Sequence, residues 1–305
     1  MIKHLTEIVE AARRKGRKRL AVAYGQDAHT ISAVYDAYNE GLVEPTLYGD
    51  KKVIEQVCAD EGIDVNVFRI IDEKSDLKCV AMAVAAVVSG DADVLMKGLV
   101  STDKYMRGIL NKDAGLFPPK GTLSHVAIME MPEYHKLLLI SDVAVIPLPD
   151  FKQKTILIGY LTKTANLLGI ERPKIACIAP SEQVLPSVPS STEAAILAKM
   201  GDRGQLGNVT VDGPLSLDVS LYKEAAEQKK VKGSSVAGDP DCLLFPNIES
   251  ANVFFKSVSH FGHGELAAMV MGTKVPCVLT SRGDSVLTKK YSIALACLVA
   301  PWKWT

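Results

Sequence analysis

The stretch Asp93–Thr102 reads D-V-L-M-K-G-L-V-S-T, an apolar run, broken by one lysine, that ends in two hydroxyl residues. An apolar run without strict alternation of polar residues is typical of a strand that is buried on both faces of a sheet. Runs of the same kind recur along the chain, at Leu20–Tyr24, Leu137–Ile140, Ile175–Ile178, Cys242–Phe245 and Cys277–Leu279.

Longer stretches with helical spacing lie between these runs. Strands that alternate with helices predict an α/β fold, in which a parallel sheet is layered between helices. In such sheets ligands bind at the carboxyl ends of the strands, where loops lead into helix N-termini. The predicted helices are Thr30–Glu40, Lys78–Val88, Thr192–Met200 and Leu221–Lys229, and the strand ends to search are 97–102, 141–142, 179–182, 246–252 and 280–285.

The size and charge of the chain limit what it can be. A chain of 305 residues is long enough for two cores, so we expect two domains. Hydrophobic residues make up 48% and charged residues 23%, as in an ordinary globular enzyme. The 35 Lys and Arg residues balance the 35 Asp and Glu residues, so no overall field attracts nucleic acid or an anionic membrane. We therefore expect neither as a partner.

The first 19 residues and the cysteines indicate a cytoplasmic protein. The N-terminal segment is charged throughout, and no segment has the apolar length of a signal peptide or a membrane span. Six dispersed cysteines without a C-x-x-C suit buried free thiols better than disulfides or zinc. The tripeptide Arg282-Gly283-Asp284 would need an extracellular protein to act in cell adhesion, so that interpretation is disfavoured.

Thr280, Ser281, Arg282 and Gly283 combine hydroxyls, a guanidinium and a glycine where a strand leads into a helix. Backbone N–H groups and the helix dipole favour a bound phosphate at such a turn, and arginine matches phosphate oxygens with its planar fork. The alternative is a plain helix N-cap with the arginine on a solvated face. The segment by itself supports both interpretations equally.

Lys97 lies inside its apolar run and is followed by Ser101, Thr102 and Arg107. Because burying a lone ammonium is costly, this lysine is either paired with a carboxylate or used in binding. The structural alternative is a salt bridge to Asp93 or to Asp103. If a helix starts near Thr102, Arg107 on its second turn can lean back toward the strand end.

Ser124 and His125 are adjacent, so on a strand they point to opposite faces and cannot form a nucleophile–base dyad. We expect this segment to line the substrate, with His125 as a candidate proton carrier. His260 and His263 stand among glycines, and no third ligand is evident, so we expect no metal there. The nucleotide-binding patterns G-x-G-x-x-G after a strand and G-x-x-x-x-G-K-[ST] are also absent.

Taken together, the chain resembles the phosphate acyltransferase family, the phosphotransacetylases, and in particular its phosphate butyryltransferase branch. The stretches that carry the resemblance run along nearly the whole chain: M-K-G-L-V-S-T, L-S-H-V-A, P-L-P-D-F-K-Q-K, D-G-P-L-S-L-D, F-P-N-I-E-S-A-N-V-F-F-K and V-L-T-S-R-G-D-S.

The resemblance implies two three-layer α/β domains with a cleft between them, as in isocitrate and isopropylmalate dehydrogenases. The first domain would comprise residues 1–143 with 281–305, and the second residues 144–280, which would form a homodimer or a higher homo-oligomer. The prolines of Val143–Asp150 mark the expected boundary. The implied reaction is the reversible conversion of acyl-CoA and inorganic phosphate into acyl phosphate and CoA. CoA is a substrate there, and no metal or permanently bound cofactor is needed.

The resemblance also implies roles for residues. Ser281 would hydrogen-bond the reacting oxygen, and Arg282 would bind phosphate or CoA. Arg107 would bind substrate phosphate, and Ser124 and His125 would occupy the family's serine pair. With Arg107, the expected residues for substrate or phosphate binding are Lys97, Thr102, Ser124, Thr280 and Gly283. The expected CoA-binding or cleft-lining residues are Asn247, Glu249 and Asn252 in Pro246–Lys256.

One position departs from the acetyl-specific pattern. Seven residues after Ser281, where those members carry a catalytic Asp, this chain has Thr288. Asp284 and His125 are the candidate bases, unless none is needed, because a thiol with a pKa of about 8.5 is already partly ionised at neutral pH. The resemblance to the butyryl branch favours acyl chains longer than acetyl.

Three alternatives stay open: an acetyl-specific enzyme, a dehydrogenase on the related fold, and a non-catalytic protein that binds CoA or acyl phosphate. The missing acidic metal cluster counts against the dehydrogenase. The sequence fixes neither the acyl chain length and direction of reaction nor a role for Trp302 and Trp304.

Overall fold

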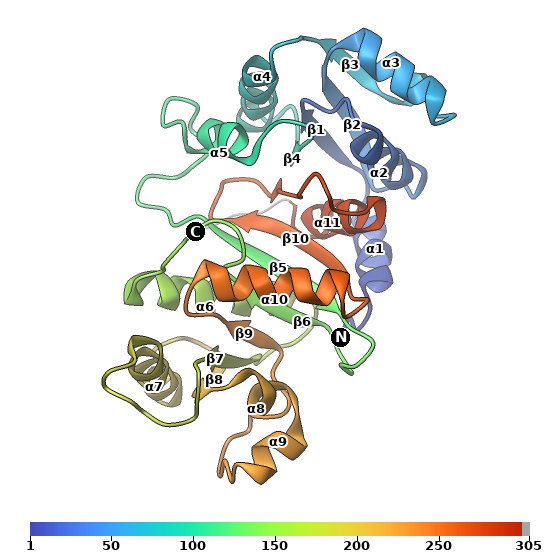
Figure 1. Cartoon of the computed structure of the whole chain (residues 1–305). Helices are drawn as coiled ribbons and strands as arrows, with labels where there is room; N and C mark the ends of the chain where they lie inside the picture. The colour runs from blue at the N-terminus through green and yellow to red at the C-terminus, as the bar shows by residue number, and fades with distance from the viewer. Residues whose placement is uncertain (301–305) are drawn as a thin grey trace. The chain divides into compact units, whose positions relative to one another are not determined.

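The computed structural model describes residues 1–300, and Trp302 and Trp304 lie outside them. The chain, which Figure 1 colours by residue number, divides into two compact units. The first, here called the N/C unit, comprises residues 5–123 and the described residues from Leu266 on. The second, the middle unit, comprises residues 1–4 and 124–265.

The N/C unit is built on a mainly parallel sheet with the strand order β3-β2-β1-β4-β11-β10. Strands β1, β2, β3, β4 and β11 run parallel, and β10 is antiparallel to β11. The chain order reverses between β1 and β4, which makes their carboxyl ends a topological switch point. The strands are β1 (Lys18–Ala23), β2 (Val43–Gly49), β3 (Arg69–Asp72), β4 (Val94–Lys97), β10 (Glu265–Met271) and β11 (Cys277–Val278).

Helices surround this sheet, and most begin at a side chain that caps the first turn. Asp27, Ser75, Ser101 and Ser285 each accept a hydrogen bond from a backbone N–H of the helix that follows. The helices are α1 (Leu5–Arg14), α2 (Ala28–Asn39), α3 (Lys51–Asp60), α4 (Asp76–Ser89), α5 (Thr102–Leu110) and α11 (Val286–Val299), with a short 3₁₀ turn at Val65–Val67.

The strands of the middle unit follow the order β5-β6-β9-β7-β8, in which only β5 runs antiparallel to β6. Asp150 and Gln153 form a capping box at the start of α6. The elements are β5 (Ser124–Glu130), β6 (Leu138–Ser141), β7 (Lys174–Ile178), β8 (Thr210–Leu215) and β9 (Cys242–Leu244), with α6 (Phe151–Leu167), α7 (Pro189–Asp202), α8 (Leu217–Leu221), α9 (Lys223–Gln228) and α10 (Ile248–His260).

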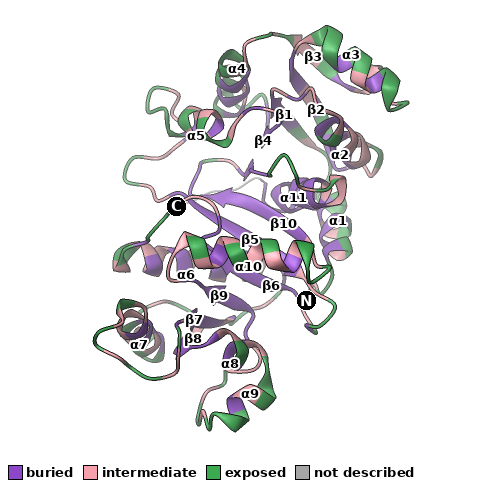
Figure 2. Cartoon of the chain, in the orientation of Figure 1, coloured by how far each residue is buried: buried purple, intermediate pink, exposed green. Residues whose placement is uncertain are grey.

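The predicted α/β class is confirmed, since helices alternate with strands in both units and most strands are buried (Figure 2). One predicted helix differs: Leu221–Lys229 is interrupted at Tyr222, where α8 ends and α9 follows. No helix among residues 1–300 is long and apolar enough to cross a membrane.

The boundaries between the compact units lie between Leu123 and Ser124 and between Glu265 and Leu266. Both precede in sequence the expected boundaries at 143/144 and 280/281. Pairing explains the difference, because β5 pairs with β6 and β6 pairs with β9 in the same sheet. The proline-containing segment Val143–Asp150 therefore links β6 to α6 inside the middle unit.

Candidate active site

Three parallel strands of the N/C unit, β1, β4 and β11, end side by side. The loops that follow them are 24–27, 98–101 and 279–285. The first two loops are in direct backbone contact, because the N–H groups of Gly98 and Leu99 donate to the carbonyls of Ala23 and Tyr24 at 2.9 and 2.8 Å. A Cβ on Gly98 would lie 2.4 Å from the Tyr24 carbonyl oxygen, so only glycine allows this approach. The switch point of the sheet thus brings the loop 24–27, which was not predicted, next to the predicted strand-end loop 98–101.

Lys97, the last residue of β4, is buried, with 3% of its surface exposed. Its ammonium donates to the carbonyl oxygens of Gly98 and Val100, both at 3.0 Å. The alternative of a salt bridge to Asp93 or Asp103 is wrong, because Asp93 pairs with Arg19 and Asp103 pairs with Arg107. Among residues 1–300 the Lys97 ammonium lies within 4.0 Å of no carboxylate oxygen.

A second buried lysine, Lys289 on α11, was not predicted from the sequence. It is 2% exposed, and its ammonium donates to the carbonyl oxygens of Ser281 and Asp284 at 2.8 and 2.9 Å. Figure 2 shows α11 as an almost wholly buried helix. A charged residue inside such an apolar helix was the available clue, but Lys289 and Lys290 are adjacent, and the sequence does not say which one is buried.

The segment Thr280–Asp284 forms a turn between β11 and α11. The Asp284 carboxylate accepts the Ser281 N–H at 2.7 Å, and the Ser281 hydroxyl accepts the Gly283 N–H at 3.4 Å. Ser281, Arg282 and Gly283 are exposed, whereas Thr280 is buried and its hydroxyl has no hydrogen-bond partner within residues 1–300. The cap of α11 is Ser285, so the turn precedes the helix and is not its N-cap.

The electrostatics of this site favour an anion. Burial, together with the positive charges of Lys289 and Arg282, lowers the pKa of Lys97 from 10.5 to about 8. Burial also lowers the pKa of Lys289, against the opposing effect of Asp284 and Asp27. One carboxylate oxygen of Asp27 is buried without a hydrogen-bond partner among the described residues. Three cations face two carboxylates here, so the local charge is positive.

Helix α5 carries the other two predicted phosphate ligands. It begins at Thr102, as expected, after the cap Ser101, whose hydroxyl accepts the Lys104 N–H at 3.4 Å. Thr102 and Arg107 are exposed. The Arg107 guanidinium forms an ion pair with Asp103 at 3.1 Å, one turn earlier on the same helix.

Ser124 and His125 lie at the start of β5 in the middle unit, next to the end of β6. The hydroxyl oxygens of Ser124 and Ser141 are 2.9 Å apart. The backbone N–H of His125 donates to the Asp142 carboxylate at 3.2 Å. Asp142 also accepts the N–H groups of the three residues 144–146, so it fixes the loop after β6. The sequence singled out Ser141 and Asp142 as a strand end without giving them this role.

The expected CoA segment starts at the end of β9, next to β6 in the same sheet. Asn247 caps α10 by accepting the Ser250 N–H at 2.9 Å, and the Asn252 amide donates to the Val143 carbonyl at 3.0 Å. Glu249 is exposed on the first turn of α10. The side chains of Asn247 and Asn252 thus hydrogen-bond to backbone groups, whereas the Glu249 side chain is exposed.

The predicted residues therefore fall into two groups, each described within its own unit. Lys97, Thr102, Arg107 and the 280–284 turn lie on or after neighbouring strands of the N/C unit. Ser124 and His125 lie on β5, and Asn247, Glu249 and Asn252 follow β9, the two strands that flank β6 in the middle unit. The first group, with Lys289 and Asp27 added, has the charge and exposed donors to hold a phosphate beside a reacting carbonyl.

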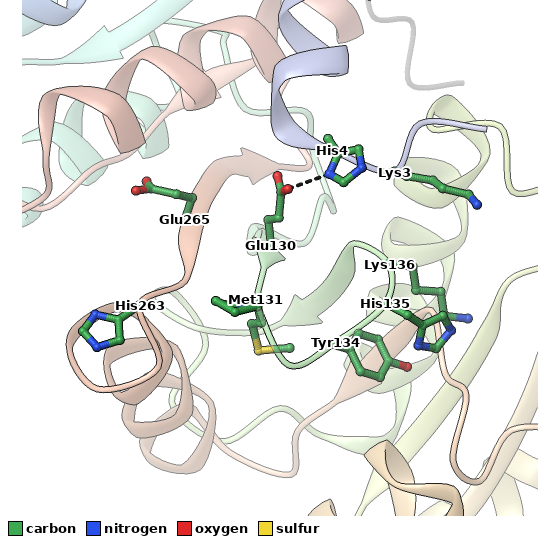
Figure 3. Close-up of a pocket in the computed structure, with 10 residues that line it drawn as sticks. Lys3, His4, Glu130, Met131, Tyr134, His135, Lys136, His263 and Glu265 are labelled. Atoms are coloured by element: carbon green, nitrogen blue, oxygen red, sulfur yellow. Dashed lines mark hydrogen bonds and ion pairs between the residues drawn. The ribbon is translucent and has the colours of Figure 1, made fainter.

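His263 belongs to a separate cavity of about 380 Å³ in the middle unit (Figure 3). His4 and Glu130 meet there at 2.7 Å, and burial, then the charge of Glu130, raises the pKa of Glu265. Nevertheless, residues 1–300 contain no group of three or more His, Cys, Asp or Glu side chains placed to hold a metal ion.

Comparison with known proteins decides the family. The sequence profile described as phosphate acetyl/butaryl transferase matches residues 4–83 and 77–297. The chain belongs to this family. A phosphate butyryltransferase from Clostridium acetobutylicum is 43% identical over 98% of this chain and 99% of that protein. A phosphate acetyltransferase from Thermotoga maritima is 40% identical over 97% of this chain and 99% of that protein. Membership of this acyltransferase family confirms the resemblance.

Solved structures agree with the fold. A branched-chain phosphotransacylase from Enterococcus faecalis V583 has a TM-score of 0.81 and 29% identity, covering 93% of this chain and 99% of that one. A 4-hydroxythreonine-4-phosphate dehydrogenase from Klebsiella pneumoniae has a TM-score of 0.56 at 13% identity, covering 92% of this chain and 98% of that one, and shows the fold alone. The predicted dehydrogenase-like fold is confirmed.

Proposed function

We propose that this protein catalyses reversible acyl transfer between CoA and inorganic phosphate. A phosphate oxygen attacks the thioester carbonyl carbon, a C–O bond forms, the C–S bond breaks, and CoA leaves as the thiolate. The observation that carries the proposal is the family match, which covers nearly the whole chain. The matched residues include the positively charged strand-end site of the N/C unit.

In this proposal the N/C unit binds the phosphate. Arg282, exposed on its turn, contacts the phosphate oxygens, and the buried charges of Lys97 and Lys289 add a positive potential behind it. The Ser281 hydroxyl donates to the carbonyl oxygen as negative charge develops there. Thr102, Arg107, Gly283 and the unpartnered Thr280 hydroxyl complete the phosphate site.

The middle unit contributes the remaining proposed groups. His125 and Ser124 are buried at the edge of their sheet, and Glu249 is exposed on α10. We assign these side chains to the acyl-CoA side of the reaction. Asn247 and Asn252, whose amides hold backbone, shape that surface through the loop they stabilise.

Asp284 is the proposed base. Thr288 has no carboxylate to offer, and its hydroxyl lies 3.1 Å from the Ser285 hydroxyl inside the first turn of α11. One oxygen of the Asp284 carboxylate accepts the Ser281 backbone N–H, so the other oxygen is available to accept a proton during the reaction. His125 is the alternative base.

A short-chain or branched acyl group larger than acetyl is the proposed substrate. Two phosphate butyryltransferases, at 43% and 41% identity, and the branched-chain phosphotransacylase structure support this choice. The Thermotoga maritima phosphate acetyltransferase, at 40%, supports acetyl-CoA as the second candidate.

A panel of acyl-CoAs tests the proposal. CoA release from acetyl-, butyryl- and isobutyryl-CoA is measured with and without inorganic phosphate. We expect phosphate-dependent release that is fastest with butyryl- or isobutyryl-CoA. Absence of phosphate-dependent release from all three thioesters would identify a non-catalytic binding protein instead.

The assembly and the location also belong to the proposal. We infer a homodimer through the middle unit, supported by the exposed side chains of Val253 at 65%, Phe261 at 83% and Tyr222 at 49%. Six buried free cysteines suit the reducing cytoplasm. The reaction as written requires CoA as a substrate and no permanently bound cofactor.

A further inference from the structure

Lys289 stands out among the buried charged groups of the N/C unit. Helix α11 is buried over eleven of its residues, and Lys289 lies among them with 2% of its surface exposed. Burying an ammonium costs free energy unless hydrogen bonds compensate. A position of this kind, next to the proposed site, calls for a role that a neutral side chain cannot fill.

The two bonds of the Lys289 ammonium close the 281–284 turn from the helix side. They reach the carbonyls of Ser281 and Asp284, the first and last residues of the turn, at 2.8 and 2.9 Å. On the same turn the Asp284 carboxylate accepts the Ser281 N–H at 2.7 Å. Arg282 and Gly283, between these anchors, are exposed, and a Cβ on Gly283 would meet no atom of residues 1–300 within 4 Å. The conformation that presents Arg282 therefore depends on Lys289.

Lys97 repeats the arrangement on the neighbouring strand end, where its ammonium binds the Gly98 and Val100 carbonyls. The groups that act on Lys97 are Lys289 and Arg282, which disfavour its charge, and Asp27 and Asp284, which favour it. Two ammonium groups placed close enough to repel each other are unfavourable for folding alone. Such an arrangement is useful where an anionic substrate has to bind.

We propose that Lys289 is a positioning residue for acyl transfer: its ammonium fixes the turn that presents Ser281 and Arg282 and keeps a positive charge beside Lys97. This inference rests on the proposed function. Lys289 itself need not touch the substrate, since it acts through the turn and through the field at Lys97.

The test compares Lys289→Met with Lys290→Met, two neighbouring lysines on one helix. Lys290 forms an ion pair with Glu40 at 2.7 Å, away from the turn, so its substitution is the matched control. We expect Lys289→Met to lower kcat about 100-fold with KM for acyl-CoA changed less than about threefold, because the lost interaction orients reacting groups. Lys290→Met should retain kcat within about twofold.

A pH profile separates positioning from a purely structural role. Burial and then the charge of Lys289 lower the pKa of Lys97, so removing that charge raises this pKa. In this proposal activity requires the Lys97 ammonium, so the alkaline fall of kcat/KM, expected near pH 8 in the wild type, moves to higher pH in Lys289→Met. Lys289→Arg keeps the charge, so it should recover at least about tenfold of the lost rate and leave the alkaline fall in place. An unshifted profile in Lys289→Met would overturn the proposed coupling.

Hydrogen exchange gives a readout that does not depend on activity. The amides of residues 281–284 should exchange faster in Lys289→Met than in the wild type, and at the wild-type rate in Lys290→Met. If Lys289→Met does not fold, Lys289→Gln, which is neutral but polar, takes its place in all three measurements. Wild-type kcat together with unchanged exchange would overturn the inference. A wild-type protein inactive with every acyl-CoA would refute the proposed function. The exchange data would still decide whether Lys289 fixes the 281–284 turn.

Discussion

Both units place charged and hydroxyl side chains at the carboxyl ends of parallel strands, but among residues 1–300 only in the middle unit does the lysine form ion pairs with the carboxylates of its cluster. After β7 and β8 of the middle unit, the Ser216 hydroxyl bonds both Glu182 and Asp218, and Lys229 lies 3.0 Å from Asp218. Hydrogen bonds from Ser216 and Lys229 lower the pKa of Asp218 to about 2. After β4 and β11 of the N/C unit, Lys97 and Lys289 bind only backbone carbonyls.

The difference separates a cluster that serves folding from one that serves binding. In the middle-unit cluster the Lys229 ammonium lies 3.7 Å from Glu182 and 3.0 Å from Asp218, so this cation is satisfied by carboxylates without a ligand. The N/C cluster has excess positive charge and a buried Thr280 hydroxyl without a partner among the described residues. Such a site costs stability and attracts an anion. Four substitutions probe this contrast.

Arg282→Ala should have the largest effect. We expect kcat/KM to fall about 10²- to 10⁴-fold, roughly 3 to 5 kcal/mol of transition-state stabilisation, because the phosphate loses its bidentate partner. Steady-state kinetics with butyryl-CoA and phosphate measure it. Arg203→Ala, an exposed arginine after α7 of the middle unit, is the control and should be unchanged. Near-normal turnover in Arg282→Ala would remove this residue from the site.

Lys97→Met tests the cost of the unbalanced charge through pH. The pKa of Lys97 is lowered in the folded chain, so between pH 8 and 10.5 the unfolded chain binds more protons than the folded one. The unfolding free energy of the wild type should therefore rise over this range relative to Lys97→Met, by about 3 kcal/mol. Urea unfolding of both proteins at several pH values measures the difference. A constant difference would show that Lys97 is not under electrostatic strain.

Asp284→Asn isolates the proposed base from the turn. Asparagine keeps an oxygen that can accept the Ser281 N–H, so the turn survives while the proton acceptor is lost. We expect turnover to fall about 100-fold and the acidic limb of the pH profile to flatten. If rate and profile both stay as in the wild type, Asp284 is structural and His125 becomes the candidate base.

Ser216→Ala should have the smallest effect. The middle-unit cluster loses one buried hydroxyl, which lowers the unfolding free energy by about 1 kcal/mol. Activity should stay within about twofold, because the cluster is expected to serve folding alone. Thermal unfolding measures the loss of stability, and steady-state kinetics measure the activity. A large loss of activity would remove the contrast between the two clusters.

Much of this site could be predicted from residues at strand ends. The apolar run before Lys97 and the hydroxyl residues after it predicted the loop that follows β4. The residues Thr280–Asp284 predicted the loop that follows β11. Lys289 could not be predicted, because α11 is buried nearly all round and no polar face marks which of its two adjacent lysines points inward. Asp27 was missed because the loop after Leu20–Tyr24 was not among the strand ends considered.

The sheet was only partly predictable for similar reasons. Strand β2 contains Glu44 and Pro45, and β8 contains Gly213 and Pro214, so neither reads as an apolar run. Their places depend on pairing with β1 and β7, which is a property of the folded sheet. The unit boundaries follow from such pairing as well, and local composition at Val143–Asp150 does not reveal it.

The most direct test is ³¹P NMR of butyryl-CoA mixed with inorganic phosphate and enzyme, with wild type and Arg282→Ala side by side. A phosphate acyltransferase that uses the N/C strand ends gives a butyryl phosphate resonance with the wild type, with phosphate consumed as CoA is released. The resonance should be absent over the same time with Arg282→Ala. An equal rate of acyl phosphate formation in both proteins, or none from butyryl-, isobutyryl- or acetyl-CoA with the wild type, would contradict the account.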